Sequence, residues 1–177
     1  IDAIRTFAGL DVIVICSGDG DFIPLVEYLK NQGKWVEVLA FGKTTSAINL
    51  AASLAVAEWC GGISGRDCVL AITLGLDVAC RVALAATVDR GWHRTAAMGI
   101  FGATAAAGKL LGLSVEQMVH AFGIALSQAA GNRQCIVDGA LTKRLQAGQA
   151  ASSGVFAAVL AREGFTGAQQ VFAGRYG

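Results

Sequence analysis

The pattern of apolar and polar positions changes near Ser46. Before that point, short β-branched runs indicate strands over residues 12–16 and 35–41, with a helical pattern over residues 21–31 between them. Two strands that are joined through a helix run parallel to each other. We therefore expect a short β-α-β unit of α/β type within residues 1–46.

From residue 47 onward the chain is almost entirely Ala, Gly, Leu and Val at helical spacing, and strand signals disappear. Glycines follow the ends of most predicted helices, and Ser114 with Gln117 gives a capping box at one start. Only the connection over residues 131–141 is longer than a short turn, and polar residues collect there. Helices are expected over residues 47–60, 65–87, 94–111, 114–130 and 142–163. We therefore predict a mainly α fold, in which an Ala/Gly-rich helical bundle follows the β-α-β unit.

Small residues dominate the last predicted helix. They recur at steps of three and four, which lets a neighbouring helix approach toward the near end of the usual range of about 8–10 Å. The plain interpretation is that this stripe is core and carries no ligand chemistry. The stripe consists of Ala147, Ala150, Ala151, Gly154, Ala157, Ala158 and Ala161.

The composition is that of a chain that buries a core and carries almost no net charge. Of its 177 residues, 54% are hydrophobic, and 14 Lys and Arg against 13 Asp and Glu give a net charge of +1. This balance creates no overall field that would attract nucleic acid or an anionic lipid surface. Binding to either would require a local patch of charge.

The cysteines and the apolar runs indicate in which cellular compartment the protein is located. The five cysteines are odd in number, lack CxxC spacing and lie mostly in apolar segments, which fits a reducing cytosol. The longest uncharged run, residues 145–161, is interrupted by two Gln and two Ser, so we expect no membrane-spanning segment and a cytoplasmic protein. The sequence starts without Met or a signal-like segment, and we expect it to be a fragment.

Asp19 and Asp21 lie in a glycine-broken turn directly after the first predicted strand. The carboxyl end of a parallel strand, followed by the start of a helix, is where open α/β sheets place ligands. Two carboxylates at that point would suit Mg²⁺ or Mn²⁺. The alternative is that one of them caps the following helix, while Gly18 and Gly20 supply the turn geometry.

Residues 1–46 resemble the C-terminal part of a LabA-like NYN domain, which has a PIN-like fold. The resemblance is carried by the motif SGDGDFIPLV, with Ser17, Asp19, Asp21 and Phe22. It implies a metal-dependent ribonuclease or RNA-binding module that holds Mg or Mn at Asp19 and Asp21 and has RNA as its partner. A further acidic ligand of that family follows an earlier strand, which this sequence does not contain.

Residues 47–177 resemble the helical domain of the MmgE/PrpD family, which includes 2-methylcitrate dehydratase and cis-aconitate decarboxylase. The blocks that agree are GWHRTAAMGIFGATAAAGKLLGLSVEQMVHAFGIALSQAAG, DGALTKRLQAGQAASSGVFAAVLAREGFTG and VFAGRYG. The resemblance implies a lyase without a cofactor that acts as a homodimer. Its substrate would be a small tricarboxylic acid such as 2-methylcitrate or cis-aconitate, which loses water or CO₂.

Such a lyase needs an acid or base and cations that hold the substrate carboxylates. The resemblance matches His93 with the family's active-site histidine and Lys143 with the lysine that contacts a substrate carboxylate. Arg144 lies beside this lysine, and Thr142 is expected either to cap the helix or to donate a hydrogen bond to the ligand. The alternative is that His93 is an ordinary residue before a helix and Lys143 a solvated lysine at a helix start, where the dipole disfavours a cation. His120, inside a predicted helix, is interpreted as structural.

Some positions depart from the family pattern. Gln146 stands where the family usually has His, which keeps a polar group for substrate binding but loses a titrating one. An aspartate and a His-Pro pair before the first helix are replaced by GKTTSAIN, in which Thr44 takes about the place of the histidine. The family also continues into a second domain. We therefore expect the activity of this chain to be weak or absent.

The two resemblances meet near residues 44–48, so the sequence indicates two partial domains, over residues 1–46 and 47–177. The leading hypothesis is an MmgE/PrpD-like lyase. An NYN-type ribonuclease or RNA-binding module is the alternative from a different class. A non-catalytic helical interaction domain is the third, and it would be favoured if neither ligand binds while the protein forms a stable dimer.

Overall fold

The computed structural model describes residues 12–16, 31, 35–39, 45–86 and 90–175. By contacts between its Cα atoms, the chain divides into two compact units, Ile1–Ser46 and Ala47–Gly177. Each unit is described by itself. The second unit carries nearly all of the described side chains.

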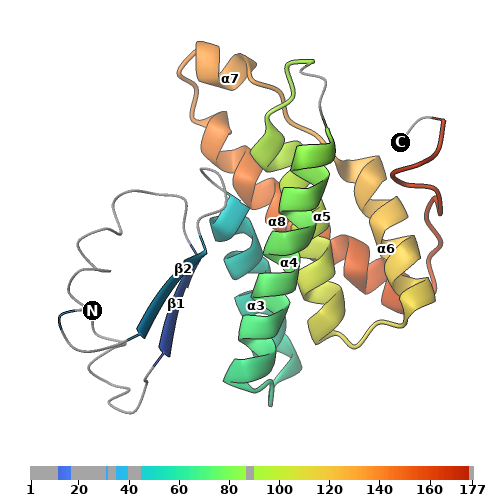
Figure 1. Ribbon diagram of the computed structural model, residues 1–177. Helices are drawn as coiled ribbons and strands as arrows, with labels where there is room; N and C mark the ends of the chain where they lie inside the picture. Colours follow the sequence, from blue (N-terminus) through green and yellow to red (C-terminus); the bar gives the residue numbers. More distant parts are fainter. Residues whose placement is uncertain (1–11, 17–30, 32–34, 40–44, 87–89, 176–177) are drawn as a thin grey trace. The chain divides into compact units, whose positions relative to one another are not determined.

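In the first unit, strands β1 (Val12–Cys16) and β2 (Trp35–Leu39) pair in parallel (Figure 1). The register runs from Val12 opposite Trp35 to Cys16 opposite Leu39. Both strands and their parallel pairing agree with the prediction. Apart from Asn31, which is helical, the helix expected between them lies outside the described residues, so the complete β-α-β unit stays a prediction.

The second unit is helical, as predicted. Each expected helix forms with ends within two residues of the prediction. The connection over residues 131–141 also contains one short helix that the sequence did not predict. The helices are α3 (Thr45–Cys60), α4 (Gly65–Ala85), α5 (Arg94–Leu110), α6 (Val115–Gln128), α7 (Gln134–Val137) and α8 (Thr142–Arg162).

Helix α5 lies at the centre of the bundle and packs against α4, α6 and α8. Its sequence allows this because Ala and Gly occupy most positions, so that the helix is buried on nearly all sides. Gly154 of α8 lies close to α5: a Cβ added there would lie 2.5 Å from the Cβ of Ala103 and 2.9 Å from the carbonyl oxygen of Ile100. The small-residue stripe of α8 is therefore core, as predicted.

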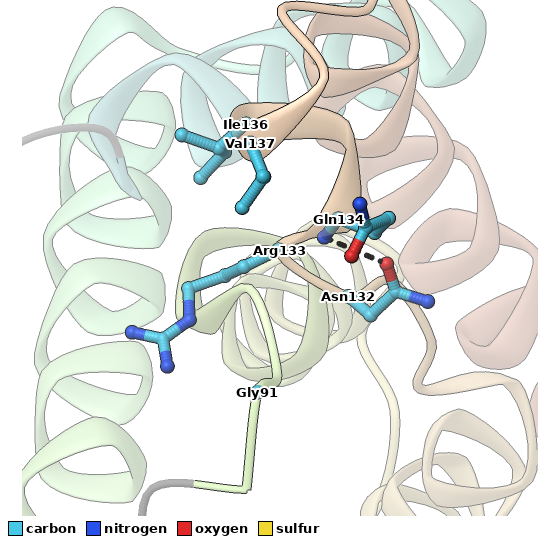
Figure 2. Close-up of a pocket in the computed structure, with 6 residues that line it drawn as sticks. All are labelled: Gly91, Asn132, Arg133, Gln134, Ile136 and Val137. Atoms are coloured by element: carbon cyan, nitrogen blue, oxygen red, sulfur yellow. Dashed lines mark hydrogen bonds between the residues drawn. The ribbon is translucent and has the colours of Figure 1, made fainter.

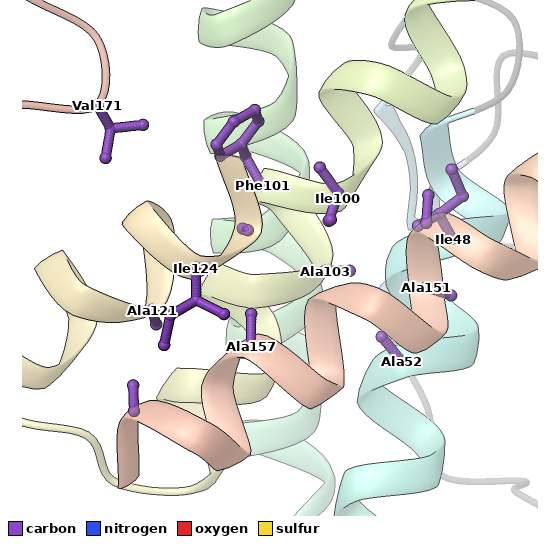
Figure 3. Packing of buried hydrophobic residues seen from close by; sticks show 13 residues of the cluster. Ile48, Ala52, Ile100, Phe101, Ala103, Ala121, Ile124, Ala151, Ala157 and Val171 are labelled. Carbon is purple, nitrogen blue, oxygen red and sulfur yellow. The ribbon is translucent and has the colours of Figure 1, made fainter. Parts of the chain in front are cut away.

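Larger side chains fill the space around these close helix contacts. Figure 3 shows Ile100 and Phe101 of α5, Ile124 of α6 and Val171 of the C-terminal segment in one cluster. The Phe101 ring also meets the ring of Phe172 edge-on, with centroids 5.2 Å apart. The capping box predicted at Ser114 is present and fixes the start of α6.

Helix α3 brings a buried amide to a glycine contact between α4 and α5. A Cβ at Gly102 would lie 2.5 Å from the carbonyl oxygen of Gly75 and 2.7 Å from Oδ1 of Asn49. Asn49 and Ser53 are fully buried, and among the described residues neither amide atom of Asn49 nor the hydroxyl of Ser53 has a hydrogen-bond partner. An unsatisfied buried polar group lowers stability by about 1–3 kcal/mol.

The described cysteine side chains form no disulfide with one another. Cys135 is buried, Cys68 and Cys80 are half-buried, and Cys60 is exposed. Burial raises the pKa of the Cys80 thiol above its ordinary value, and the Asp77 carboxylate adds to this rise. At neutral pH the Cys80 side chain is therefore held as the uncharged thiol.

Among the helices in the described ranges, α4 is the one that is long and apolar enough to cross a membrane by length and composition. Asp77 and Arg81 interrupt the apolar sequence of α4, so this helix does not contain the longest uncharged run. The two side chains form an ion pair at 2.8 Å. Core helices of water-soluble proteins satisfy the same criterion. The expectation of no membrane partner and of a cytoplasmic location stays a prediction.

Candidate active site at the polar end of the bundle

Two loops from distant parts of the chain are joined at one end of the bundle. Trp92 and Asn132 form an antiparallel bridge. On either side of it, the amide of His93 donates to the carbonyl of Gly131 at 3.1 Å, and the amide of Arg133 donates to the carbonyl of Gly91 at 2.9 Å. The bridge therefore fixes the segment that leads into α5 against the segment that follows α6.

His93 is the residue that precedes α5, and its carbonyl accepts the amides of Ala96 and Ala97. Residues at this position are usually Ser, Thr, Asp or Asn, whose side chains bond to the first turn. The His93 side chain makes no such capping bond to the described helix. It is buried, and its ring is directed to a different partner.

That partner is the side chain of Gln146, on the second turn of α8. Nδ1 of His93 lies 2.6 Å from Oε1 of Gln146. The amide nitrogen of Gln146 in turn donates to the backbone carbonyl of Asn132 at 3.1 Å. The imidazole, the amide and the bridged loop thus form one chain of hydrogen bonds.

Gly131 lets these groups come together. Its φ of +105° is a conformation that residues with a Cβ rarely adopt. A Cβ at this position would lie 2.8 Å from the Cβ of Ala96 and 3.1 Å from Oε1 of Gln146. The absence of a side chain therefore allows α8 to present its amide to the loop.

The remaining predicted residues lie on the first turn of α8. Residues three or four apart are neighbours on a helix surface, so Thr142 and Lys143 lie on the same side of α8 as Gln146. Arg144 is two residues from Gln146 and lies on a different side of the helix. All three of these first-turn residues are exposed. The structure thus brings His93 and Gln146 into contact, with Lys143 one turn away.

Of the two roles expected for Thr142, capping of α8 is excluded by the structure, and the hydrogen bond to a ligand stays a prediction. The residue that precedes the helix is Leu141, and within the described structure no side chain caps this helix start. Lys143 and Arg144 therefore lie in a first turn that carries no acidic residue. The positive charges of Lys143 and Arg144 thus lie at the start of α8, where the helix dipole also favours anions.

A hollow of about 540 Å³ adjoins the bridged loops. Figure 2 shows that Asn132, Arg133, Gln134, Ile136 and Val137 line it from one side and Gly91 from the other, with the Arg133 side chain extended away from Asn132 and Gln134. His93, Lys143 and Gln146 do not line this hollow. Arg133 supplies a cation to its wall.

Neither Asn132 nor Arg133 was predicted as a site residue. The sequence signal that could have identified them was their position in the long polar connection after α6. The side chain of Asn132 accepts the amide of Gln134 at 3.0 Å, and its carbonyl accepts both Gln146 and the thiol of Cys135. Asn132 therefore orders the start of α7 as well as the amide of Gln146.

Neighbouring side chains hold this end of the bundle in place. The guanidinium of Arg94 donates to the carbonyls of Ala83 and Ala86 at the end of α4. These carbonyls have no partner within their own helix, so Arg94 ties the start of α5 to the end of α4. His120 has a structural role, as predicted, because its ring contacts Gly167 beyond α8 at 3.3 Å.

The predicted metal ligands Asp19 and Asp21 lie outside the described residues. In the described part of the chain, no three His, Cys, Asp or Glu side chains gather in a way that would hold a metal ion.

Together these features describe a helical domain in which the side chains of His93 and Gln146 meet at one end of the bundle. The chain belongs to the MmgE/PrpD family, because the model of the MmgE/PrpD N-terminal domain matches residues 42–177. This confirms the resemblance that the sequence blocks indicated.

Relatives of the chain carry names that indicate a lyase-like family. A cis-aconitate decarboxylase-like protein of Aspergillus oryzae is 40% identical over 119 residues, which cover 65% of this chain and 24% of the relative. The cis-aconitate decarboxylase of Aspergillus terreus is 37% identical over 131 residues, 72% of this chain and 26% of the relative. The human cis-aconitate decarboxylase is 36% identical over 112 residues, 61% and 23%. The chain thus spans about a quarter of the length of these relatives.

A second family model also matches. The NYN domain model matches residues 1–56, which overlaps the MmgE/PrpD match at residues 42–56. This match agrees with the resemblance carried by the SGDGDF motif.

Proposed function

We propose that the helical unit binds a small acid with two or three carboxylates and serves the lyase chemistry of the MmgE/PrpD family. The observation that carries this proposal is the contact between His93 and Gln146 with Lys143 one turn away on α8. An imidazole that exchanges a proton and an ammonium that holds a carboxylate are the two tools that such a reaction needs.

The proposed roles follow from where the charges lie. Lys143 binds one substrate carboxylate through its ammonium group. For a substrate such as cis-aconitate, the bond between a carbon and a carboxylate breaks, CO₂ leaves, and the electron pair stays on the substrate. A proton delivered from His93 then completes the product, and His93 regains its proton from water.

A titration of the purified chain with cis-aconitate, followed by calorimetry, tests this proposal. We expect binding that weakens about tenfold or more in Lys143→Ala, since a hydrogen bond to a charged group contributes about 1.5–3 kcal/mol. Lys109→Ala is the matched control, because Lys109 is an exposed lysine in the last turn of α5. No detectable binding, or equal affinity in Lys143→Ala and the parent, would contradict the proposal.

If binding is found, CO₂ release and loss of water are measured on the same samples. His93→Gln is expected to keep most of the affinity and to abolish turnover, because the amide keeps a polar group but exchanges no proton. The expectation that the chain alone has weak activity is tested in the same assay. A stable dimer without binding of either ligand would favour the interaction-domain alternative.

The NYN match supports a second candidate function for the first unit. Residues 1–56 match this domain, and Asp19 and Asp21 are the acidic residues of its motif. The proposal is cleavage or binding of RNA that requires Mn²⁺ or Mg²⁺. Its test is cleavage of single-stranded RNA with Mn²⁺, which Asp19→Asn should abolish; cleavage that persists in this variant would contradict it.

A further inference from the structure

We propose that Gln146 is a positioning residue that holds neutral His93 in the tautomer with its proton on Nδ1, so that Nε2 is the atom that exchanges protons. The tautomer follows from hydrogen bonds of this chain alone. Its meaning for catalysis rests on the proposed function.

The orientation of the Gln146 amide is the first step. Its one end contacts the backbone carbonyl of Asn132, which accepts hydrogen bonds and cannot donate. The end that faces this carbonyl must therefore be the NH₂ group. The amide oxygen is thereby directed to His93.

The protonation of the imidazole is the second step. The amide oxygen of Gln146 accepts and cannot donate, so the close contact of 2.6 Å is a hydrogen bond only if Nδ1 of His93 carries a proton. A neutral imidazole has one N–H group. Nε2 therefore has the free electron pair, whereas an unconstrained neutral histidine carries its proton mainly on Nε2.

The third step concerns what prevents the Gln146 amide from rotating and exchanging the positions of its oxygen and nitrogen. The carbonyl that it contacts belongs to the bridged loop, which is fixed by the paired bonds of His93 and Arg133. Gly131 packs against the amide from the loop side, and a Cβ at this glycine would lie 3.1 Å from the amide carbon of Gln146. An amide does not titrate, so this orientation is independent of pH over the range in which proteins stay folded.

The consequence is a histidine that works through one nitrogen. Neutral His93 accepts a proton at Nε2, and the resulting cation donates the same proton back while Nδ1–H stays bonded to Gln146. Gln146 thus has the orienting role that a carboxylate has in a Ser-His-Asp triad, without adding a charge.

Nitrogen NMR of the ¹⁵N-labelled chain tests the tautomer without any substrate. The chain contains two histidines, His93 and His120, so both rings are assigned readily. At a pH where His93 is neutral, we expect its Nε2 to resonate at the position of an unprotonated nitrogen and its Nδ1 at that of a protonated one. The reverse pattern in the parent chain overturns the proposal.

Three variants separate positioning from packing. Gln146→Leu keeps the side-chain size but removes the acceptor, and we expect the His93 pattern to shift to mainly Nε2–H. Gln146→Glu restores an acceptor and is expected to restore Nδ1–H. Gln149→Leu is the matched control, since Gln149 lies one turn further along α8 and donates to Ser153, and it should leave the His93 pattern unchanged.

An unchanged His93 pattern in Gln146→Leu would contradict the proposal, and so would failure of Gln146→Glu to restore it. Should Gln146→Leu not fold, the pattern in the parent and in Gln146→Glu still decides. The expected tautomer with no binding of cis-aconitate would leave the positioning role intact and reject the proposed function. Binding with the opposite tautomer would do the reverse.

Discussion

Glycine brings a side-chain amide close to a neighbouring segment at two places in the helical unit, but the two amides differ in burial and in hydrogen bonding. At the centre, Gly102 faces the amide of Asn49, which has no hydrogen-bond partner among the described residues. At the polar end, Gly131 faces the amide of Gln146, which bonds at both of its ends. The central contact allows close packing of the helices, whereas at the polar end the amide contacts the imidazole of His93.

The difference has a physical basis. Helix backbones at the centre use their own N–H and C=O groups, so a side-chain amide placed between them finds no free donor or acceptor. Loops leave backbone groups unpaired, and the carbonyl of Asn132 is one that a side chain reaches. The half-buried amide of Gln146 is therefore satisfied beside the loop, whereas the buried amide of Asn49 finds no partner among the described residues.

The largest expected effect is at the centre. In Gly102→Ala the new Cβ would lie 2.5 Å from the carbonyl oxygen of Gly75 and 2.8 Å from the Cβ of Ala79, and backbone cannot yield easily. We expect the free energy of unfolding to fall by about 3 kcal/mol, at the upper end for overpacking. Chemical denaturation measures it.

Gly148→Ala is the control for this variant, because Gly148 lies in α8 with no described atom within 4 Å of its Cβ position. This substitution should instead raise stability by about 0.5–1 kcal/mol, since Ala is the better helix former. If Gly102→Ala were as stable as the parent, α4 and α5 would not meet as closely as described.

A smaller loss is expected at the polar end. Gly131→Ala combines a φ of +105° with a contact of 2.8 Å to Ala96, and we expect a loss of about 2 kcal/mol. Gly112→Ala is the control that isolates the backbone strain, because its φ is +69° with no described atom near the Cβ position. Thermal unfolding compares the two, and equal losses would show that the contact with Ala96 has no cost.

The smallest expected effect is a gain. Asn49→Leu replaces an unsatisfied buried amide with an apolar side chain of similar size, so the unfolding free energy should rise by about 1 kcal/mol. Equilibrium denaturation in urea measures the change. A loss of stability instead would show that the amide of Asn49 has a partner, and the contrast with Gln146 would disappear.

The helices could be predicted because their sequence pattern is continuous and their ends carry local signals. The capping box at Ser114 is such a signal, and the small-residue stripe of α8 predicted its close packing. Helix α7 was missed because it is a single turn that depends on Asn132 and on the bond between Gln134 and Asp138. A turn held by such bonds has no apolar period.

The site could be predicted only in part. His93 and Lys143 were predicted through resemblance, and Gln146 was predicted as a substrate ligand, whereas the structure shows it bonded to His93. Asn132 was missed because it acts mainly through its backbone carbonyl, which every residue type has. The buried position of Asn49 was missed as well, because a polar residue in a helix gives no sign that three helices meet over it.

The paired bonds across the bridge have a mechanical consequence. The amide of His93 and the amide of Arg133 each close the same loop-to-loop junction, but from opposite directions. Both bonds lie within three residues on each segment. One of them therefore cannot stay broken for long while the other remains formed. A displacement of the connection between α6 and α8 would therefore move the backbone of His93, and its imidazole, together with that connection.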